Sequence, residues 1–264
     1  MSKQTRKPKP GGGGGVSKSF YLIIIAVIVL GGAGLLLAGM NRDEALGPMS
    51  LADTEVEANP GVGVSEGAAD APAILVEFSD YQCPHCAAFN GFAGRLLRQN
   101  YVSNGMLRWT VYEFPLEHFA NAIPAAIAAR CAGDQGRFWE MRDMLFGNQR
   151  EWATQGNPKK TFEGYATELG LDKKQFASCF NGREHLAEIM SAKKYGENQG
   201  VSGTPTLFFN GRRVSAASYE AIEELILAAA AERAAAQDTA AGDAEATGDA
   251  GAGSAEGSAA GSGG

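Results

Sequence analysis

The chain has 264 residues, of which 45% are hydrophobic and 20% charged, and this composition excludes a wholly disordered protein. The formal net charge is −7, which argues against nucleic-acid binding because neutralising phosphates requires a basic surface. Four cysteines are too few for a small disulfide-dense protein, but they suffice for one redox pair and one structural cross-link.

An uncharged apolar segment lies near the N-terminus. Residues 20–40 contain no charged side chain, and at about 1.5 Å per residue this segment is long enough to cross a bilayer. Basic residues precede it, so the positive-inside rule places residues 1–19 in the cytoplasm and the chain after the segment outside. We therefore expect one transmembrane helix that anchors an extracytoplasmic domain. A cleaved signal peptide and a buried core helix are the alternatives.

Two segments flank the part of the chain that can form a core. Residues 41–70 are rich in glycine, alanine and acidic residues, and we expect them to be a linker. Residues 236–264 contain no aromatic and no branched aliphatic residue, so they cannot bury enough surface to offset the entropy of ordering. We expect them to be a disordered acidic tail, which leaves residues 71–235 as one folded domain.

The hydrophobic pattern of this domain changes its period in a definite order and predicts an α/β fold. In chain order the predicted elements are a buried strand at 73–78, a helix after Cys86, a strand at 106–114, a helical block at about 118–199, a hairpin at 206–214 and a helix at 218–233. The clearest helix signal runs from Asp172 to Phe180, since Asp172 and Gln175 have capping-box spacing. Asn210-Gly211 gives the hairpin its turn.

The tetrapeptide Cys83-Pro84-His85-Cys86 predicts the chemistry. A Cys-x-x-Cys pair at a helix start places the first sulfur beside unpaired backbone N–H groups and the positive end of the helix dipole, which favour the thiolate. We expect Cys83 to be the nucleophile and Cys86 to be the resolving thiol. Pro84 suits the first helical position, and His85 adds a nearby donor or partial positive charge. Half of a zinc site is the alternative, but zinc would need two more ligands, and we expect no metal.

From about residue 70 to 235 the chain resembles thioredoxin-fold thiol:disulfide oxidoreductases of the DsbA type, specifically their membrane-anchored, single-domain branch. The segments that carry the resemblance are Val76 to Cys86, Arg130 to Gly133, Phe138 to Met141 and Val201 to Thr206. The resemblance implies a thioredoxin fold with a helical insertion at about 118–199, preceded here by one transmembrane helix. We expect no cofactor besides the cysteine pair.

The same resemblance assigns roles to three more residues. It implies that Pro205 is a cis proline facing the cysteine pair, with Thr204 against the sulfurs, where an extended substrate segment can pair with the backbone. An ordinary edge-strand proline is the alternative. Glu77 lies six residues before Cys83 and matches the buried acid that in this family assists proton transfer to and from the inner cysteine. An exposed carboxylate at a strand end is the alternative.

Cys131 and Cys179 end two predicted helices and lie 48 residues apart. We interpret them as a structural disulfide within the helical block, which on a chain-entropy model stabilises the fold by about 4 kcal/mol. Reduced, buried cysteines that act as small apolar residues are the alternative.

These patterns together predict an extracytoplasmic protein thiol:disulfide oxidoreductase that introduces disulfides through Cys83 and Cys86. Its expected partners are unfolded or reduced exported proteins and, by resemblance, a quinone-linked membrane reoxidase of the DsbB-like or vitamin-K-epoxide-reductase-like type. We expect a membrane-anchored monomer with its catalytic domain in the periplasm or another extracytoplasmic compartment. A disulfide isomerase or reductase of the same fold is one alternative, and a non-catalytic thioredoxin-fold binding or chaperone module is another.

Overall fold

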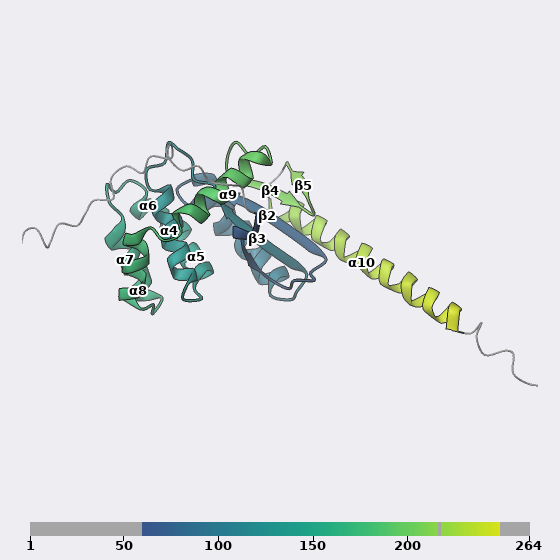
Figure 1. The fold of residues 1–264 in the computed structure, drawn as a ribbon. Helices are drawn as coiled ribbons and strands as arrows, with labels where there is room; N and C mark the ends of the chain where they lie inside the picture. The colour runs from purple at the N-terminus through teal and green to yellow at the C-terminus, as the bar shows by residue number, and fades with distance from the viewer. Residues whose placement is uncertain (1–59, 216–217, 249–264) are drawn as a thin grey trace, which may run out of the picture. The chain divides into compact units, whose positions relative to one another are not determined.

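Five strands form one mixed sheet in the order β1-β3-β2-β4-β5 (Figure 1). The computed structural model describes residues 60–215 and 218–248, and the side chains of residues 61–215 and 218–240. β2 and β3 run parallel, whereas the other neighbouring pairs are antiparallel. The strands are β1 (Val64–Glu66), β2 (Ala73–Ser79), β3 (Leu107–Glu113), β4 (Thr206–Phe209) and β5 (Arg212–Val214).

The helices account for most of the remaining described residues. Residues 84–102 form one continuous helical segment, in which η2 and η3 are π-helical turns. This segment consists of α2 (Pro84–Phe89), η2 (Asn90–Gly94), α3 (Arg95–Leu97) and η3 (Arg98–Val102). The other helices are η1 (Pro60–Val62), α4 (Ala122–Gly133), α5 (Phe138–Gly147), α6 (Gln149–Trp152), α7 (Lys159–Glu168), α8 (Lys173–Gly182), α9 (Leu186–Asn198) and α10 (Tyr219–Gly248).

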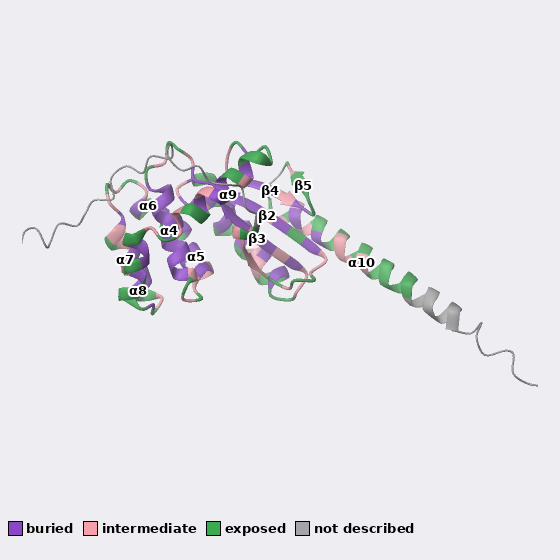
Figure 2. Cartoon of the chain, viewed as in Figure 1, coloured by how far each residue is buried: buried purple, intermediate pink, exposed green. Residues whose placement is uncertain are grey.

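Helices cover both faces of the sheet, as burial of a two-sided apolar sheet requires. On one face, Leu75 and Trp109 belong to a core that also holds apolar residues of segment 84–102 and of α10. On the other face, Phe78 and Tyr112 pack with Ala192 of α9. Helix α4 packs against α5, α7, α8 and α9, and buried residues follow both the sheet and this helical block (Figure 2).

The pairing of β2 with β4 brings two distant parts of the chain together. The strands are antiparallel, and Phe78 of β2 lies opposite Thr206 of β4. The loop that follows β2 therefore lies beside the loop that precedes β4. The first loop carries Cys83, and the second carries Pro205.

The α/β prediction and the order of its elements are confirmed. Asp172 caps α8 as its spacing predicts, because its carboxylate accepts the backbone N–H groups of Lys174 and Gln175 at 2.8 and 2.9 Å. The hairpin between β4 and β5 turns at Asn210 and Gly211, whose φ angles are +44° and +80°. Both values are positive, which is why an Asn-Gly pair suits this turn.

Two expectations need correction. Residues 64–66 form β1 although they fall within the expected linker, because a three-residue strand is too short to show a period of two. Helix α10 continues to Gly248, so the expectation of a disordered tail was wrong for residues 236–248. The lack of large apolar residues favours disorder, but alanine, which recurs in residues 236–248, has the highest intrinsic helix propensity.

Several expectations fall on parts of the chain outside the described residues. These are the cytoplasmic segment 1–19, the transmembrane helix at 20–40, most of the linker at 41–70 and the end of the tail at 249–264. Within the portion that the structure does describe, no helix is both long and apolar enough to cross a membrane.

The fold predicts opposite effects for two helical glycines. A Cβ at Gly196 in α9 would lie 2.8 Å from ring carbons of both Phe78 and Phe114, so Gly196→Ala should destabilise the protein by about 1–3 kcal/mol through overpacking. A Cβ at Gly164 in α7 would meet nothing within 4 Å, so Gly164→Ala should stabilise it by about 0.5–1 kcal/mol. Urea unfolding of both variants checks this, and a shift of the same sign in both would contradict the packing of α9 on the sheet.

Candidate redox-active site

Cys83 and Thr204 meet where the loops flanking β2 and β4 lie side by side. The Cys83 sulfur lies 3.4 Å from the carbonyl oxygen of Thr204, although 121 residues separate them. The peptide bond between Thr204 and Pro205 is cis. The structure therefore brings together the two motifs that the sequence analysis singled out.

The environment of Cys83 favours its thiolate. Cys83 is the N-cap residue of α2, and Pro84 follows it at the first helical position, so the sulfur lies at the unpaired end of a helix. The pKa of Cys83 is lowered from its ordinary value to about 4. The largest cause is a hydrogen bond from the Cys86 thiol. The Thr204 side chain and the backbone N–H groups of Cys86 and His85 act in the same direction, against the effect of burial.

The hydroxyl of Thr204 is available to donate a hydrogen bond to the Cys83 sulfur. The hydroxyl is buried and has no other hydrogen-bond partner among the described residues. A buried hydroxyl without an acceptor is costly. The Cys83 thiolate is an acceptor that removes this cost, so ionising the sulfur also satisfies Thr204.

Cys86 has the opposite character. It is completely buried, and both Cys83 and Cys86 are free thiols in this structure. Burial is the main reason that the pKa of Cys86 is raised well above the ordinary thiol value, and the charges of Glu77 and Cys83 act in the same direction. The pair thus combines an outer cysteine that ionises easily with an inner cysteine that stays protonated.

Glu77 is buried in the middle of β2 and is not an exposed carboxylate. Its carboxylate forms an ion pair with the guanidinium of Arg142 at 2.6 Å and accepts a hydrogen bond from the Asn90 amide at 2.9 Å. The same amide donates to the carbonyl oxygen of Cys86 at 3.0 Å, which connects the ion pair to the inner cysteine. The buried acid was expected from the family resemblance, but the cation that partners it was not.

Arg142 is held by aromatic rings as well as by Glu77. Its guanidinium lies 5.1 Å from the ring centre of Trp109 and 5.3 Å from those of Trp139 and Phe146. A buried charge is costly unless it is paired, and these rings and Glu77 are the partners of this one. Phe138, Arg142 and Phe146 follow one another at helical spacing, which indicates that position 142 lies on the buried side of α5 but not that Glu77 is its partner.

Asp80 is the second residue that the sequence analysis missed. Its carboxylate is buried and accepts the backbone N–H groups of Gln82 at 2.7 Å and of Leu116 at 2.8 Å. Burial raises the pKa of Asp80 to about 7, the charge of Cys83 adds to the shift, and the hydrogen bonds oppose it. A carboxyl group that titrates near neutrality therefore lies in the loop that precedes Cys83.

The helical block also holds this loop in place. Gln149, at the start of α6, donates from its buried amide to the carbonyl oxygens of Tyr81 at 2.7 Å and of Cys83 at 3.0 Å. A long-range contact of this kind has no local sequence signal. The block therefore positions Cys83 in addition to covering the fold.

Pro84 and His85 lie on the surface beside Cys83. His85 lines two open hollows. One hollow is bordered by Phe92, Pro205 and Tyr219, and the other contains Cys83 and residues 114–119. Only the second of these two hollows is lined by Cys83.

The helical block contains the expected disulfide between Cys131 and Cys179, which joins α4 to α8. Among the described residues, the cluster of potential metal ligands does not include Cys83 or Cys86. The cluster that does occur surrounds Cys131 and Cys179 and also contains Asp134 and His185.

Comparison with known proteins adds a family and a fold. The family model described as thioredoxin matches residues 60–228. Among curated proteins, "Na(+)/H(+) antiporter NhaA 1" of Salinispora arenicola is 36% identical and "Na(+)/H(+) antiporter NhaA 3" of Salinispora tropica is 35% identical, each over 170 residues. These matches cover 62% of this chain but 24% of each relative, so the chain spans about a quarter of the length of these relatives.

Solved structures share the fold. BdbD from Bacillus subtilis is 20% identical, with a TM-score of 0.59 over 66% of this chain and 96% of that chain. The α-DsbA1 protein of Wolbachia pipientis is 18% identical, with a TM-score of 0.57 over 64% of this chain and 91% of that chain. MdbA, a thiol-disulfide oxidoreductase from Corynebacterium diphtheriae, is 20% identical, with a TM-score of 0.53 over 66% of this chain and 92% of that chain. At these identities the likeness establishes the fold and nothing finer.

The site predicts an unusual titration of Asp80. Its carboxyl group should titrate at about 7, whereas an ordinary aspartate titrates at about 4. In Cys83→Ser the thiolate charge is gone, so the pKa of Asp80 should fall but stay above 4, because burial is the larger cause. Carboxyl ¹³C NMR across pH measures both values, and oxidising the cysteine pair should reproduce the fall. Titration of Asp80 near 4 in the unmodified protein would contradict the buried position.

Proposed function

The chain belongs to the thioredoxin family, and we propose that it is a protein thiol:disulfide oxidoreductase that introduces disulfides into exported proteins. The observation that carries this proposal is the contrast between the lowered pKa of Cys83 and the raised pKa of Cys86. A stabilised Cys83 thiolate stabilises the reduced pair, and a stable reduced form makes the oxidised form a strong oxidant.

The reaction starts from a Cys83–Cys86 disulfide. A substrate thiolate attacks the Cys83 sulfur, the disulfide breaks, and the bonding electron pair leaves on Cys86, which takes up a proton. A second substrate thiolate then attacks the substrate sulfur of the mixed disulfide and releases Cys83 as a thiolate. Two electrons pass from the substrate dithiol to the cysteine pair, and the substrate gains one disulfide.

Two buried acids govern the proton on Cys86 in this proposal. The charge of Glu77, held in place by Arg142, disfavours a thiolate on Cys86, so this sulfur takes up a proton as it leaves. Asp80 supplies a group that can exchange a proton near neutral pH, because its pKa is about 7. Glu77 thus assists proton transfer through its charge, and Asp80 is the local acid.

Substrate binds beside Thr204 and Pro205 in this proposal. An extended segment can lie along the loop that precedes β4, with its cysteine at Cys83. The hollow next to Pro205 is lined by Ala88, Phe92 and Tyr219, and Phe92 is 59% exposed. Unfolded proteins expose apolar side chains near their cysteines, and such side chains suit this hollow.

We place the catalytic domain outside the cytoplasm, anchored by residues 20–40. The disulfide between Cys131 and Cys179 supports this location, because structural disulfides persist in oxidising compartments. The reduced Cys83–Cys86 pair then needs an electron acceptor. A quinone-linked membrane reoxidase of the DsbB-like or vitamin-K-epoxide-reductase-like type supplies one close to the anchor.

Refolding of reduced, denatured ribonuclease tests the proposed activity. The oxidised protein should restore ribonuclease activity, Cys83→Ala should not, and Cys86→Ala should accumulate a mixed disulfide with ribonuclease because no resolving thiol is present. Gly164→Ala, a helix-surface substitution away from the site, serves as the matched control and should retain full activity. Equal recovery with the unmodified protein and Cys83→Ala would reject catalysis and favour a binding module.

The reduction potential tests the direction of transfer. Equilibration with glutathione should give a potential less negative than the approximately −270 mV of thioredoxin, because the reduced pair is stabilised. A value at or below that of thioredoxin would favour the reductase alternative.

Thr204→Val should make the potential more negative by about 30 mV, since a hydrogen bond to a charged group contributes about 1.5 kcal/mol. Thr204→Ser keeps the hydroxyl and should leave the potential close to that of the unmodified protein. Equal potentials for Thr204→Val and Thr204→Ser would show that the hydroxyl does not stabilise the thiolate.

A further inference from the structure

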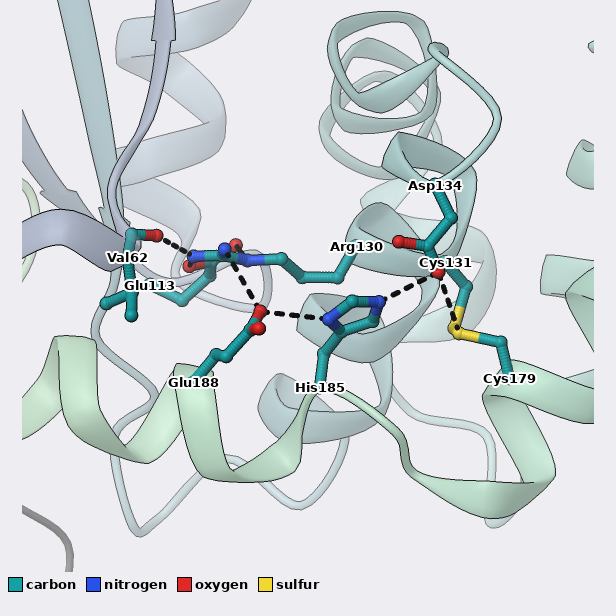
Figure 3. Close-up of polar contacts among 8 residues, drawn as sticks. All are labelled: Val62, Glu113, Arg130, Cys131, Asp134, Cys179, His185 and Glu188. Atoms are coloured by element: carbon teal, nitrogen blue, oxygen red, sulfur yellow. Dashed lines mark hydrogen bonds and ion pairs between the residues drawn. A yellow bond between two sulfur atoms is a disulfide. The ribbon is translucent and has the colours of Figure 1, made fainter.

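Four side chains from three neighbouring helices converge on the side of the helical block (Figure 3). Cys131 lies in α4, Asp134 caps its end, Cys179 lies in α8, and His185 precedes α9. One sulfur, oxygen or nitrogen atom of each lies within 4.8 Å of those of the others. Oδ2 of Asp134 lies 2.9 Å from Nε2 of His185 and 3.5 Å from the Cys179 sulfur.

We propose that these four side chains form a zinc site once the disulfide between Cys131 and Cys179 is reduced. A dithiol donor supplies two electrons and two protons, the S–S bond breaks into two thiols, and the donor becomes a disulfide. Zn²⁺ then displaces the two thiol protons and the proton between Nε2 of His185 and Oδ2 of Asp134, and binds both thiolates, the Asp134 carboxylate and Nε2 of His185. The cysteines thus exchange one cross-link for another.

The ligand types and spacing suit zinc. Zinc binds sulfur at about 2.3 Å and nitrogen or oxygen at about 2.0–2.2 Å in tetrahedral sites, so its ligands lie roughly 3–4 Å apart. The four atoms already lie within 4.8 Å of one another, and the sulfurs have only to separate after reduction. Two thiolates with one imidazole select zinc over the hard cations Mg²⁺ and Ca²⁺.

His185 is oriented in the manner of a metal ligand, and this is an independent observation. Its Nδ1 lies 2.9 Å from the Glu188 carboxylate. A carboxylate in this position accepts the Nδ1 proton, as in the carboxylate–histidine–zinc arrangement of metal sites. Nε2, the nitrogen that would bind zinc, lies 2.9 Å from Oδ2 of Asp134, so a proton lies between these two atoms and zinc has to replace it.

A second layer of contacts fixes Glu188. Its carboxylate lies 3.6 Å from Nη1 of Arg130. Arg130 in turn forms a buried ion pair with Glu113 at the end of β3, where its Nε donates to Oε1 at 2.8 Å, and donates to the carbonyl oxygen of Val62 at 2.7 Å. Figure 3 shows this chain of contacts from Val62 to Cys179. The outer partners are thus tied to the sheet, which gives the proposed site a rigid support.

The burial of the four ligand residues indicates from which side an ion can reach them. Both cysteines are buried, whereas the side chains of His185 and Asp134 are 16% and 35% exposed, so an ion can enter from that side.

With zinc bound, α4 and α8 remain linked under conditions that reduce the disulfide. The site gives the helical block, which positions the loop before Cys83 through Gln149, a cross-link in both redox states.

Cobalt and zinc titration of the full chain carrying Cys83→Ser and Cys86→Ser tests the proposal, because no competing active-site thiols remain. After reduction with a phosphine and removal of the reductant under argon, the protein should bind one Co²⁺. The absorption should show the visible bands of tetrahedral cobalt and near-ultraviolet thiolate charge transfer, and Zn²⁺ should displace the cobalt. The disulfide form should bind none. Absence of stoichiometric binding, or an octahedral spectrum, would overturn the proposal.

Three variants in this background separate the site from adventitious binding to thiols. Glu188→Gln should weaken zinc binding about 10–100-fold, His185→Ala should weaken it at least as much, and His118→Ala, which changes an exposed histidine outside the cluster, should not change it. Equal affinity in His185→Ala and His118→Ala would overturn the proposal. If the reduced protein unfolds, zinc should restore its circular dichroism spectrum in His118→Ala but not in His185→Ala, and failure of zinc to restore it would also overturn the proposal.

Discussion

The stabilisation of one negative sulfur is the interaction on which the proposed function depends. The Cys83 thiolate accepts a hydrogen bond from Cys86, lies at the first turn of α2 and faces the buried hydroxyl of Thr204. They meet because β2 pairs with β4, which sets the loop before Cys83 beside the loop that holds Thr204. The sheet register is therefore the structural basis of the sulfur chemistry.

The inner cysteine, Cys86, has surroundings that differ from those of the outer cysteine, Cys83. Cys86 is buried next to the Glu77–Arg142 ion pair, and Asn90 ties that pair to the Cys86 backbone. Removing one member of such a pair would leave an uncompensated buried charge, so the loss of either residue alone would destabilise the protein. The helical block contributes Arg142 from α5 and Gln149 from α6. It is therefore part of the site and more than an added cover.

The sequence predicted those features that have a local signal. The Cys-x-x-Cys pair, the Asp172 cap and the Asn-Gly turn each occupy a few adjacent residues, and the structure places each where its pattern indicated. Arg142 and Gln149 reach the site across 65 or more residues, so no window of sequence contains both partners. Asp80 was missed for another reason, because its raised pKa arises from burial that only the packed fold supplies.

The acidity of the Cys83 thiol is the property that distinguishes a disulfide oxidase from a protein that merely has the thioredoxin fold. Thiolate absorbance at 240 nm, recorded for the reduced protein across pH and corrected with Cys83→Ser, measures it directly. The account predicts a midpoint at about 4 for Cys83. A midpoint at about 8.5, the value of an ordinary cysteine, would contradict it.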